Sequence, residues 1–203
     1  MSSERVPVTF FFDPACPWAW MTSRWMTEVA AHRDLDVTWE VMSLRYLNED
    51  RDIDQGYRDF IAQRQDLSGA VAAAVLRDGP QVVWALYTAL GQRVHPGGRR
   101  DIDEVIREAV AEVGLAPLTQ AEIDAPAAQD LLRTHTKAMI AKVGNDVGTP
   151  TIEIDGAAFF GPVVTPAPKG QAALDLWDGC VLIARTKGFY EIKRSRTDDP
   201  IFD

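Results

Sequence analysis

The sequence predicts one α/β domain that is interrupted by an all-helical segment and then resumed. Three observations predict it: a strand–helix–strand order near the start, about a hundred following residues with only helical patterns, and strand patterns that return near the end. A chain of 203 residues fits one large domain or a domain carrying an insertion. We expect the first α/β part at residues 1–48, the helical insertion at 49–145 and the resumed α/β part at 146–203.

The first part should be a βαβ unit. Residues 6–12, "VPVTFFF", are β-branched and aromatic, and Asp13-Pro14 ends the strand that they predict. A helix should run from Pro17 to about His32, because proline suits the first helical turn and the apolar residues that follow have helical spacing. Residues 36–44 alternate as a second strand, which we expect to pair in parallel with the first.

The next segment lacks any convincing strand pattern and should fold as a compact group of helices. Glycine, proline and small polar residues predict where these helices end. The expected breaks are Ser68-Gly69, Asp78-Gly79-Pro80, His95-Pro96-Gly97-Gly98, Gly114 to Pro117, and Ala125-Pro126.

Strand patterns return in "TPTIEIDG" and "AAFFGP". Asp155-Gly156 between them is a two-residue hairpin signal. A last helix should span residues 170–186, and "FYEIKRSR" after it predicts either an edge strand or a tail. The chain therefore resumes the sheet of the first part.

Charge and composition exclude some classes of function. The formal net charge of −9 argues against a nucleic-acid footprint, which is basic, and against docking on anionic membranes. The apolar run before Asp13 is too short for a signal peptide or a membrane span. We therefore expect a cytoplasmic protein, where thiols stay reduced, and two cysteines cannot build a disulfide scaffold.

Cys16 lies at the predicted start of the first helix, followed by Pro17. Unpaired N–H groups and the helix dipole favour negative charge there, so we expect the pKa of Cys16 to lie below its ordinary value of about 8.5. The alternative is that Cys16 is a small buried hydrophobic residue. Trp18, one step further, is a candidate for stacking on a substrate or else for core packing.

A second candidate element is Thr149-Pro150, directly before the returning strand. The bond before Pro150 is either cis or part of an ordinary turn, and the Thr149 backbone can face a ligand. The three histidines have no metal-ligand spacing with either cysteine, so we predict no metal site. Cys180 lies in an apolar helical stretch and should be a core residue.

Several of these motifs together resemble a known family. "FDPACPWAWMTSRW", "VMSL", "NED", "GTPT", "FFGPV" and "EIKRSR" are similar to the mycothiol-dependent reductase (nitroreductase) group of actinobacteria, a branch of the DsbA-like thioredoxin-fold family. The likeness runs along nearly the whole chain. A Cys-Pro-Trp helix start combined with Thr-Pro before the returning strand is specific, whereas either motif alone is weak.

The resemblance implies a thioredoxin-like (DsbA-like) fold with a helical insertion, and Cys16 as a nucleophile that faces Thr149 and a cis Pro150. It implies mycothiol or another small thiol as cosubstrate, no tightly bound cofactor, and a disulfide or nitro compound as substrate. It also allows a homodimer. The same likeness places three further residues in the thiol-binding cleft, namely Asn48, Tyr57 and His95. Without it, Asn48 could be a helix cap, Tyr57 a core residue and His95 a solvated loop residue.

Ala19 stands where a dithiol site would carry its second cysteine. Cys16 can still form a mixed disulfide, but an outside thiol must release it. The sequence therefore predicts a thiol-dependent oxidoreductase with monothiol chemistry, and it does not decide whether Ala19 is natural or engineered.

Two other functions remain open. An enzyme like the kappa-class transferases or the 2-hydroxychromene-2-carboxylate isomerases would use a bound small thiol and need no second cysteine. A non-catalytic thioredoxin-like binding module is the other alternative, because a fold does not establish a function.

Overall fold

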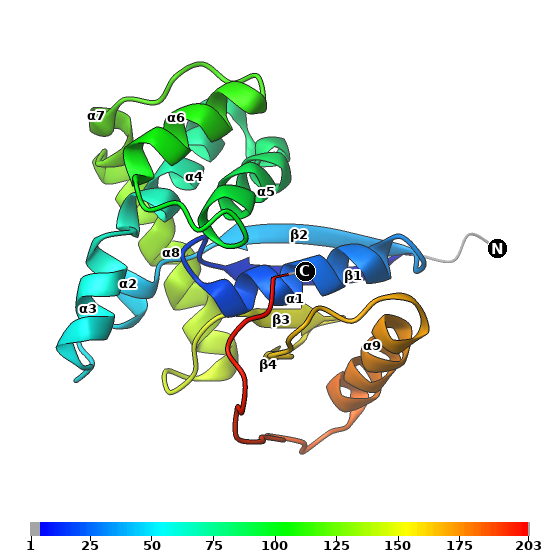
Figure 1. Ribbon diagram of the computed structural model, residues 1–203. Helices are drawn as coiled ribbons and strands as arrows, with labels where there is room; N and C mark the ends of the chain where they lie inside the picture. The colour runs from blue at the N-terminus through cyan, green and yellow to red at the C-terminus, as the bar shows by residue number, and fades with distance from the viewer. Residues whose placement is uncertain (1–4, 203) are drawn as a thin grey trace.

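Four strands form one sheet in the order β2-β1-β3-β4 (Figure 1). The computed structural model describes residues 5–202. The strands are β1 (Val6–Phe12), β2 (Leu35–Val41), β3 (Thr151–Ile154) and β4 (Ala157–Phe160). β1 pairs in parallel with β2 and antiparallel with β3, and β3 pairs antiparallel with β4. The predicted βαβ unit and the returning strands are confirmed.

The position of each strand in the sheet explains its pattern of burial. β1 is a central strand, and Phe10, Phe11 and Phe12 at its end are all buried because both faces are covered. β2 is an edge strand with partial alternation. The β3–β4 hairpin turns at Asp155 (φ 50°) and Gly156 (φ 84°), the left-handed pair that a two-residue turn of this kind requires.

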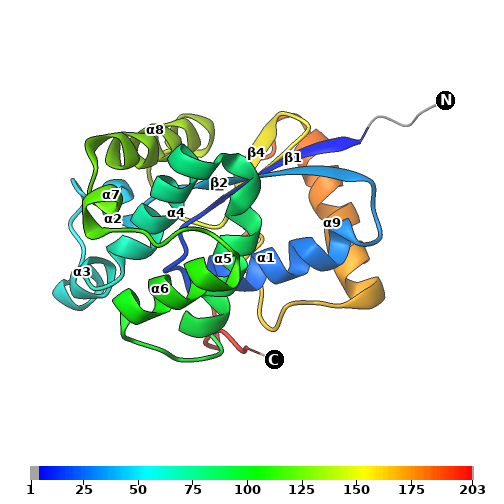
Figure 2. The same ribbon diagram turned by 90° about the horizontal axis from the view of Figure 1, so that it is seen from above.

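Two helices from the ends of the chain pack together beside the sheet. They are α1 (Pro17–Ala30) and α9 (Gly170–Arg185). The indole N–H of Trp25 in α1 donates to the carbonyl of Ala173 in α9 at 3.0 Å. α8 (Pro126–Val143) lies on the other side of the sheet from α1 when the molecule is seen from above (Figure 2).

The segment between β2 and β3 is helical. Besides α8 it contains α2 (Leu44–Leu47), α3 (Gln55–Ala62), α4 (Gln65–Asp78), the 3₁₀ helix η1 (Pro80–Val82), α5 (Val83–Val94), α6 (Ile102–Glu112) and α7 (Gln120–Ile123). Aromatic rings tie this insertion to the sheet: Tyr87 of α5 stacks on Phe12 of β1 at 3.9 Å between ring centroids, and Trp84 stacks on Trp39 of β2 at 4.3 Å. The insertion therefore packs directly on the strand that leads to Cys16.

Three details differ from the prediction. The expected break at Ser68-Gly69 is wrong, because α4 continues through it: a Cβ on Gly69 would lie 2.8 Å from Ile123, so this glycine serves close helix packing. The strand expected at 36–44 ends at Val41, where the chain turns into α2. No strand forms in 189–196, so this segment is a tail. Across residues 5–202, no helix has both the length and the apolar character needed to cross a membrane.

Candidate active site

A tight turn at the end of β1 presents Cys16, and Asp13 holds this turn together. One Asp13 carboxylate oxygen accepts from the Ala15 N–H at 2.8 Å, and the other accepts from the Leu44 N–H at 2.7 Å. The Asp13 carbonyl accepts from the Cys16 N–H at 2.9 Å. Burial raises the pKa of Asp13 to about 6, while these backbone hydrogen bonds lower it. Asp13 therefore fixes the start of α1 relative to the start of α2.

Cys16 is the N-cap residue of α1, and its sulfur has two polar neighbours. The Ala19 N–H donates to Sγ at 3.4 Å, and the thiol donates to the carbonyl oxygen of Thr149 at 3.4 Å. The Thr149–Pro150 peptide bond is cis, which agrees with the resemblance. The Thr149 hydroxyl donates to the Phe11 carbonyl at 2.8 Å, so the β3 approach is held beside the end of β1. Cys16, Ala19, Thr149 and Pro150 thus lie together.

The expected low pKa of Cys16 is wrong for this structure. Burial raises the pKa of Cys16 to about 12, and the nearby Asp13 carboxylate raises it further, while the Ala19 and Trp18 N–H groups and the Arg196 charge lower it. Only 6% of Cys16 is exposed. Removing water from the sulfur therefore outweighs the helix N-terminus, and the residue is a thiol in this conformation.

His95 lies against the same turn. Its Nε2 is 2.9 Å from the carbonyl oxygen of Pro14, and since a carbonyl only accepts, Nε2 carries the proton. Burial lowers the pKa of His95 to about 4, so the ring is neutral at pH 7. The ring also packs on Trp20 of α1, with 5.6 Å between centroids. His95 is thus a buried part of the Cys16 wall and not a solvated loop residue.

The other two cleft candidates differ in their relation to Cys16. Tyr57 is half-buried and stacks on Phe60; burial raises its pKa to about 12, and charges on Cys16 and Asp13 raise it further. Asn48 is buried, and its side-chain amide donates to the Leu44 carbonyl at 2.7 Å. Among the described residues, no hydrogen bond links Asn48 to Cys16.

Trp18 is partly buried in the first turn of α1, and its ring faces a residue from the far end of the chain. The guanidinium carbon of Arg196 lies 4.9 Å from the centroid of this ring. Trp20 and Trp25 are buried core residues, as their helical spacing indicates. Cys180 is buried in α9, and burial raises its pKa to about 12, so it is a core residue as predicted.

Sequence reasoning missed Asp13, Arg196 and Phe202. Asp13-Pro14 indicated only the end of a strand, although aspartate before a tight turn is typical of a side chain that accepts from the backbone. Arg196 and Phe202 lie in a tail with no periodic pattern, so no local signal indicated their position. Their contacts arise only in three dimensions.

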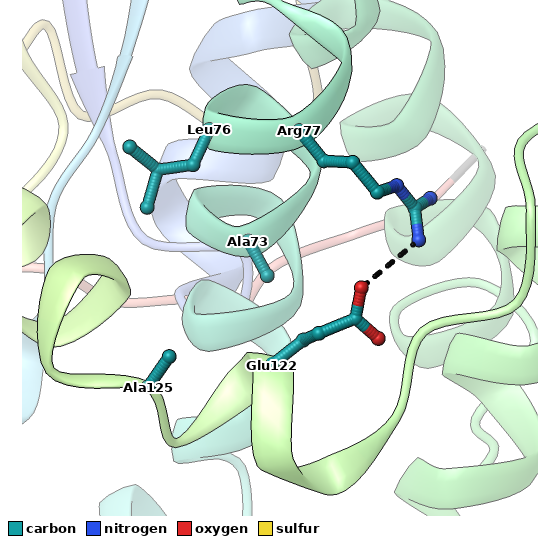
Figure 3. Close-up of a pocket in the computed structure, with 5 residues that line it drawn as sticks. All are labelled: Ala73, Leu76, Arg77, Glu122 and Ala125. Carbon is teal, nitrogen blue, oxygen red and sulfur yellow. Dashed lines mark hydrogen bonds and ion pairs between the residues drawn. The ribbon is translucent and has the colours of Figure 1, made fainter.

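A hollow elsewhere on the surface is not part of this site. It lies where α4 meets α7 and the start of α8, and an ion pair of 3.3 Å joins Arg77 Nη1 to Glu122 Oε1 beside it (Figure 3). None of the candidate site residues lines it. Within residues 5–202, no group of three or more His, Cys, Asp or Glu side chains is arranged to hold a metal ion.

Residues 15–194 match the family described as Rv2466c-like, mycothiol-dependent nitroreductase Rv2466c. The chain belongs to this family. The uncharacterized protein Rv2286c of Mycobacterium tuberculosis is 30% identical over 200 residues, which cover 94% of this chain and 82% of that protein. The membership confirms the predicted family and indicates an enzyme of the thiol oxidoreductase kind.

Solved structures share the fold at low sequence identity. A putative protein disulfide isomerase from Nitrosomonas europaea superimposes with a TM-score of 0.57 and 14% identity, covering 88% of this chain and 98% of that one. The cytosolic disulfide reductase DsbM from Pseudomonas aeruginosa, solved with GSH, superimposes with a TM-score of 0.56 and 17% identity. This match covers 87% of this chain and 99% of that one. Together with the sheet and helix arrangement, these likenesses confirm the DsbA-like thioredoxin fold.

Proposed function

We propose that this protein is a cytoplasmic monothiol oxidoreductase, with Cys16 as its nucleophile and a small thiol, mycothiol, as its cosubstrate. One observation carries the proposal. Ala19 is fully buried one helical turn after Cys16, with its N–H directed at the sulfur, at the position where a resolving thiol would stand. The second cysteine, Cys180, is buried in α9 and packs in the core.

The chemistry needs two small thiols for each disulfide that is fully reduced. The Cys16 thiolate attacks one sulfur of a disulfide, so a Cys16–S–S–R bond forms and the other half leaves as a thiolate, which takes up a proton. An outside thiolate then attacks the sulfur of R, forms a new disulfide with it and releases the Cys16 thiolate. This first cycle exchanges one thiol for another. In a second cycle Cys16 attacks the new disulfide, the R half leaves as a thiol, and a second outside thiolate releases Cys16. Over the two cycles two small thiols are oxidised to their disulfide and one substrate disulfide is reduced to two thiols. With a nitro compound, the same two electrons and two protons would give a nitroso product and water.

Backbone groups around Cys16 support each step. The Ala19 and Trp18 N–H groups lower the pKa of Cys16 and so favour the thiolate once water reaches the sulfur. The Thr149 carbonyl accepts from the thiol in the resting state. Trp18 and Tyr57 are partly buried, and we assign ligand contact to these two side chains. We assign Pro150, Asn48 and His95, which are buried, to the wall behind them.

The test is the mass of the intact protein after incubation with mycothiol disulfide, followed by peptide mapping. We expect one adduct on Cys16, none on Cys180, and release of the adduct by excess mycothiol. Cys16→Ser should give no adduct, and Cys180→Ser should behave like the wild type. A wild-type protein that stays unmodified, in conditions where it remains folded, would overturn the proposal.

The isomerase or transferase alternative has one observation in its favour. In this structure Cys16 is a protonated, buried thiol, and such a group could donate a hydrogen bond to a bound small thiol as a serine hydroxyl would. The Cys16→Ser variant separates the two functions. Turnover that survives this substitution would favour the alternative, whereas turnover that is lost together with the adduct supports the monothiol enzyme.

A further inference from the structure

The end of the chain lies across the start of α1. After α9 ends at Arg185, residues 187–202, which we name the C-terminal strap, form no helix or strand. The strap leaves α9, passes below the sheet and rises in front of α1 (Figures 1 and 2), where Phe202 reaches His95 at the end of α5. The family match ends at residue 194, so the last part of the strap lies beyond the matched region.

Three contacts fix the last part of the strap, and two of them are to residues of the candidate active site. The Arg196 guanidinium lies over the Trp18 ring, 4.9 Å from its centroid. The Phe202 ring packs on the His95 ring at 5.8 Å between centroids. The Ile201 N–H donates to the Thr165 hydroxyl oxygen at 2.7 Å. The strap therefore touches the two residues, Trp18 and His95, that flank Cys16.

The strap makes its contacts near its end, and its middle is exposed. Phe202 is 38% exposed, whereas Ile192 is 74% and Tyr190 is 92% exposed. Apart from the contacts above, the residues from 187 to 199 are exposed or only half-buried. Such a segment can detach from one anchored end without disturbing the core, because few buried contacts hold it.

With the strap in place, Cys16 and Thr149 are each only 6% exposed. Thr149 lies just before β3 and outside its ladder, so an extended polypeptide at Cys16 could use the Thr149 backbone for main-chain hydrogen bonds. Here the Thr149 carbonyl is already taken by the Cys16 thiol. A small thiol needs much less open surface than a polypeptide chain.

We propose that the C-terminal strap is a specificity-determining wall of the active site, which admits small thiols and small disulfides to Cys16 and excludes protein disulfides. The inference rests on the proposed function and names its substrate class. Phe202 is the anchor of the strap, and Arg196 holds it over Trp18. Detachment of the strap also lets water reach the sulfur, which favours the thiolate.

The test compares two reagents with the same reactive group and different size. N-ethylmaleimide and a maleimide carrying a long polyethylene glycol chain both react with the thiolate, so the ratio of their rates cancels any change in the pKa of Cys16. All variants carry Cys180→Ser, which leaves Cys16 as the reacting thiol. Phe202→Glu should raise the ratio of the large reagent's rate to the small reagent's rate by about tenfold. Partial burial of a phenyl ring shifts the equilibrium between detached and closed strap towards the closed form by roughly that factor.

Ile192→Glu is the matched control, because it makes the same change on the exposed part of the strap and should leave the ratio unchanged. A chain that ends at Thr186 should raise the ratio at least as much as Phe202→Glu and should also reduce insulin disulfides faster. An unchanged ratio in both Phe202→Glu and the shortened chain would overturn the inference, as would an equal rise in Ile192→Glu. If the wild type forms the mycothiol adduct while the ratio stays constant, only the strap is refuted. If the folded wild type forms no adduct, the proposed function fails.

Discussion

Replacing His95 with glutamine should change how the stability of the protein depends on pH. The Nε2–H of His95 donates to the Pro14 carbonyl, and burial lowers the pKa of His95 from 6.5 to about 4. A glutamine amide keeps a donor for the Pro14 carbonyl and does not titrate. The variant therefore removes the proton-binding group while retaining a hydrogen bond at the Cys16 turn.

The magnitude follows from the two pKa values. His95 binds its proton less readily in the folded state than in the unfolded state, so its stabilisation is fully present above pH 6.5 and is lost as the pH falls towards 4. At about 1.4 kcal/mol for each pH unit in this window, the wild type loses about 3 kcal/mol from this residue. His95→Gln has no such loss. Its free energy of unfolding relative to the wild type should therefore rise by about 3 kcal/mol between pH 7 and pH 4.

Asp13 provides a control with the opposite sign. Its pKa is raised from 3.8 to about 6 by burial, so the folded state takes up a proton first and gains stability as the pH falls through this window. In the wild type the stability lost at His95 on acidification is therefore largely offset by the stability gained at Asp13. Asp13→Asn should therefore lose stability relative to the wild type on acidification, also by about 3 kcal/mol over the window.

The measurement is urea unfolding of the wild type and both variants at several pH values between 4 and 7, with the slope against urea checked for constancy. The quantity that tests the reasoning is how the difference in free energy of unfolding between each variant and the wild type changes with pH. The size of that difference at a single pH also contains the effect of the substitution on packing. Curves for His95→Gln and the wild type that stay parallel, within about 1 kcal/mol, would refute the reasoning that burial keeps His95 neutral.

Two further substitutions test the packing around Cys16. Ala19→Cys should form a disulfide between Cys16 and the introduced thiol under mild oxidation, seen in the intact mass as a loss of two hydrogens and no mycothiol adduct. The substitution should lower the free energy of unfolding by about 1–3 kcal/mol, because Ala19 is fully buried. A persistent adduct would show that the new thiol cannot reach Cys16. Gly91→Ala should lower the free energy of unfolding by about 1–3 kcal/mol or more, since its Cβ would lie 2.2 Å from the Trp20 ring. Gly179→Ala, where a Cβ meets no atom within 4 Å, should instead raise it by roughly 0.5–1 kcal/mol, and urea unfolding that ranks the two glycines equally would contradict this.

Local patterns were sufficient to predict that the four strands and the first helix exist, because each depends on neighbours in the sequence. β1 and the Asp155-Gly156 turn required only side-chain type and backbone preference. Gly69 misled the prediction, since a glycine that ends a helix and one that lets two helices approach look alike in sequence. The end of β2 also depends on a distant group, because the Asp13 carboxylate accepts from Leu44 and so starts α2.

In the candidate site, too, some features have a local signal in the sequence and others depend on the folded chain. Cys16 at a helix start and Thr149-Pro150 before a strand are local signals, and the structure brings them together. The pKa of Cys16 was mispredicted because a helix N-terminus can be recognised in the sequence, whereas the burial that outweighs it cannot. Arg196 and Phe202 reach the site from a tail without regular structure, so only the folded chain shows their proximity.

A protonated resting thiol is consistent with a site that lacks a second cysteine. In a dithiol site, a sulfenic acid or mixed disulfide on the first cysteine is captured at once by its neighbour. Ala19 has no thiol that could attack such an adduct. If the Cys16 thiolate were permanently exposed, any adduct on it would therefore persist until an outside thiol removed it. Oxidation follows thiolate character and exposure, and the burial of Cys16 lowers both. In the function we propose, a buried and protonated Cys16 limits oxidation that Ala19 could not reverse, while a small thiol or disulfide can still enter and react.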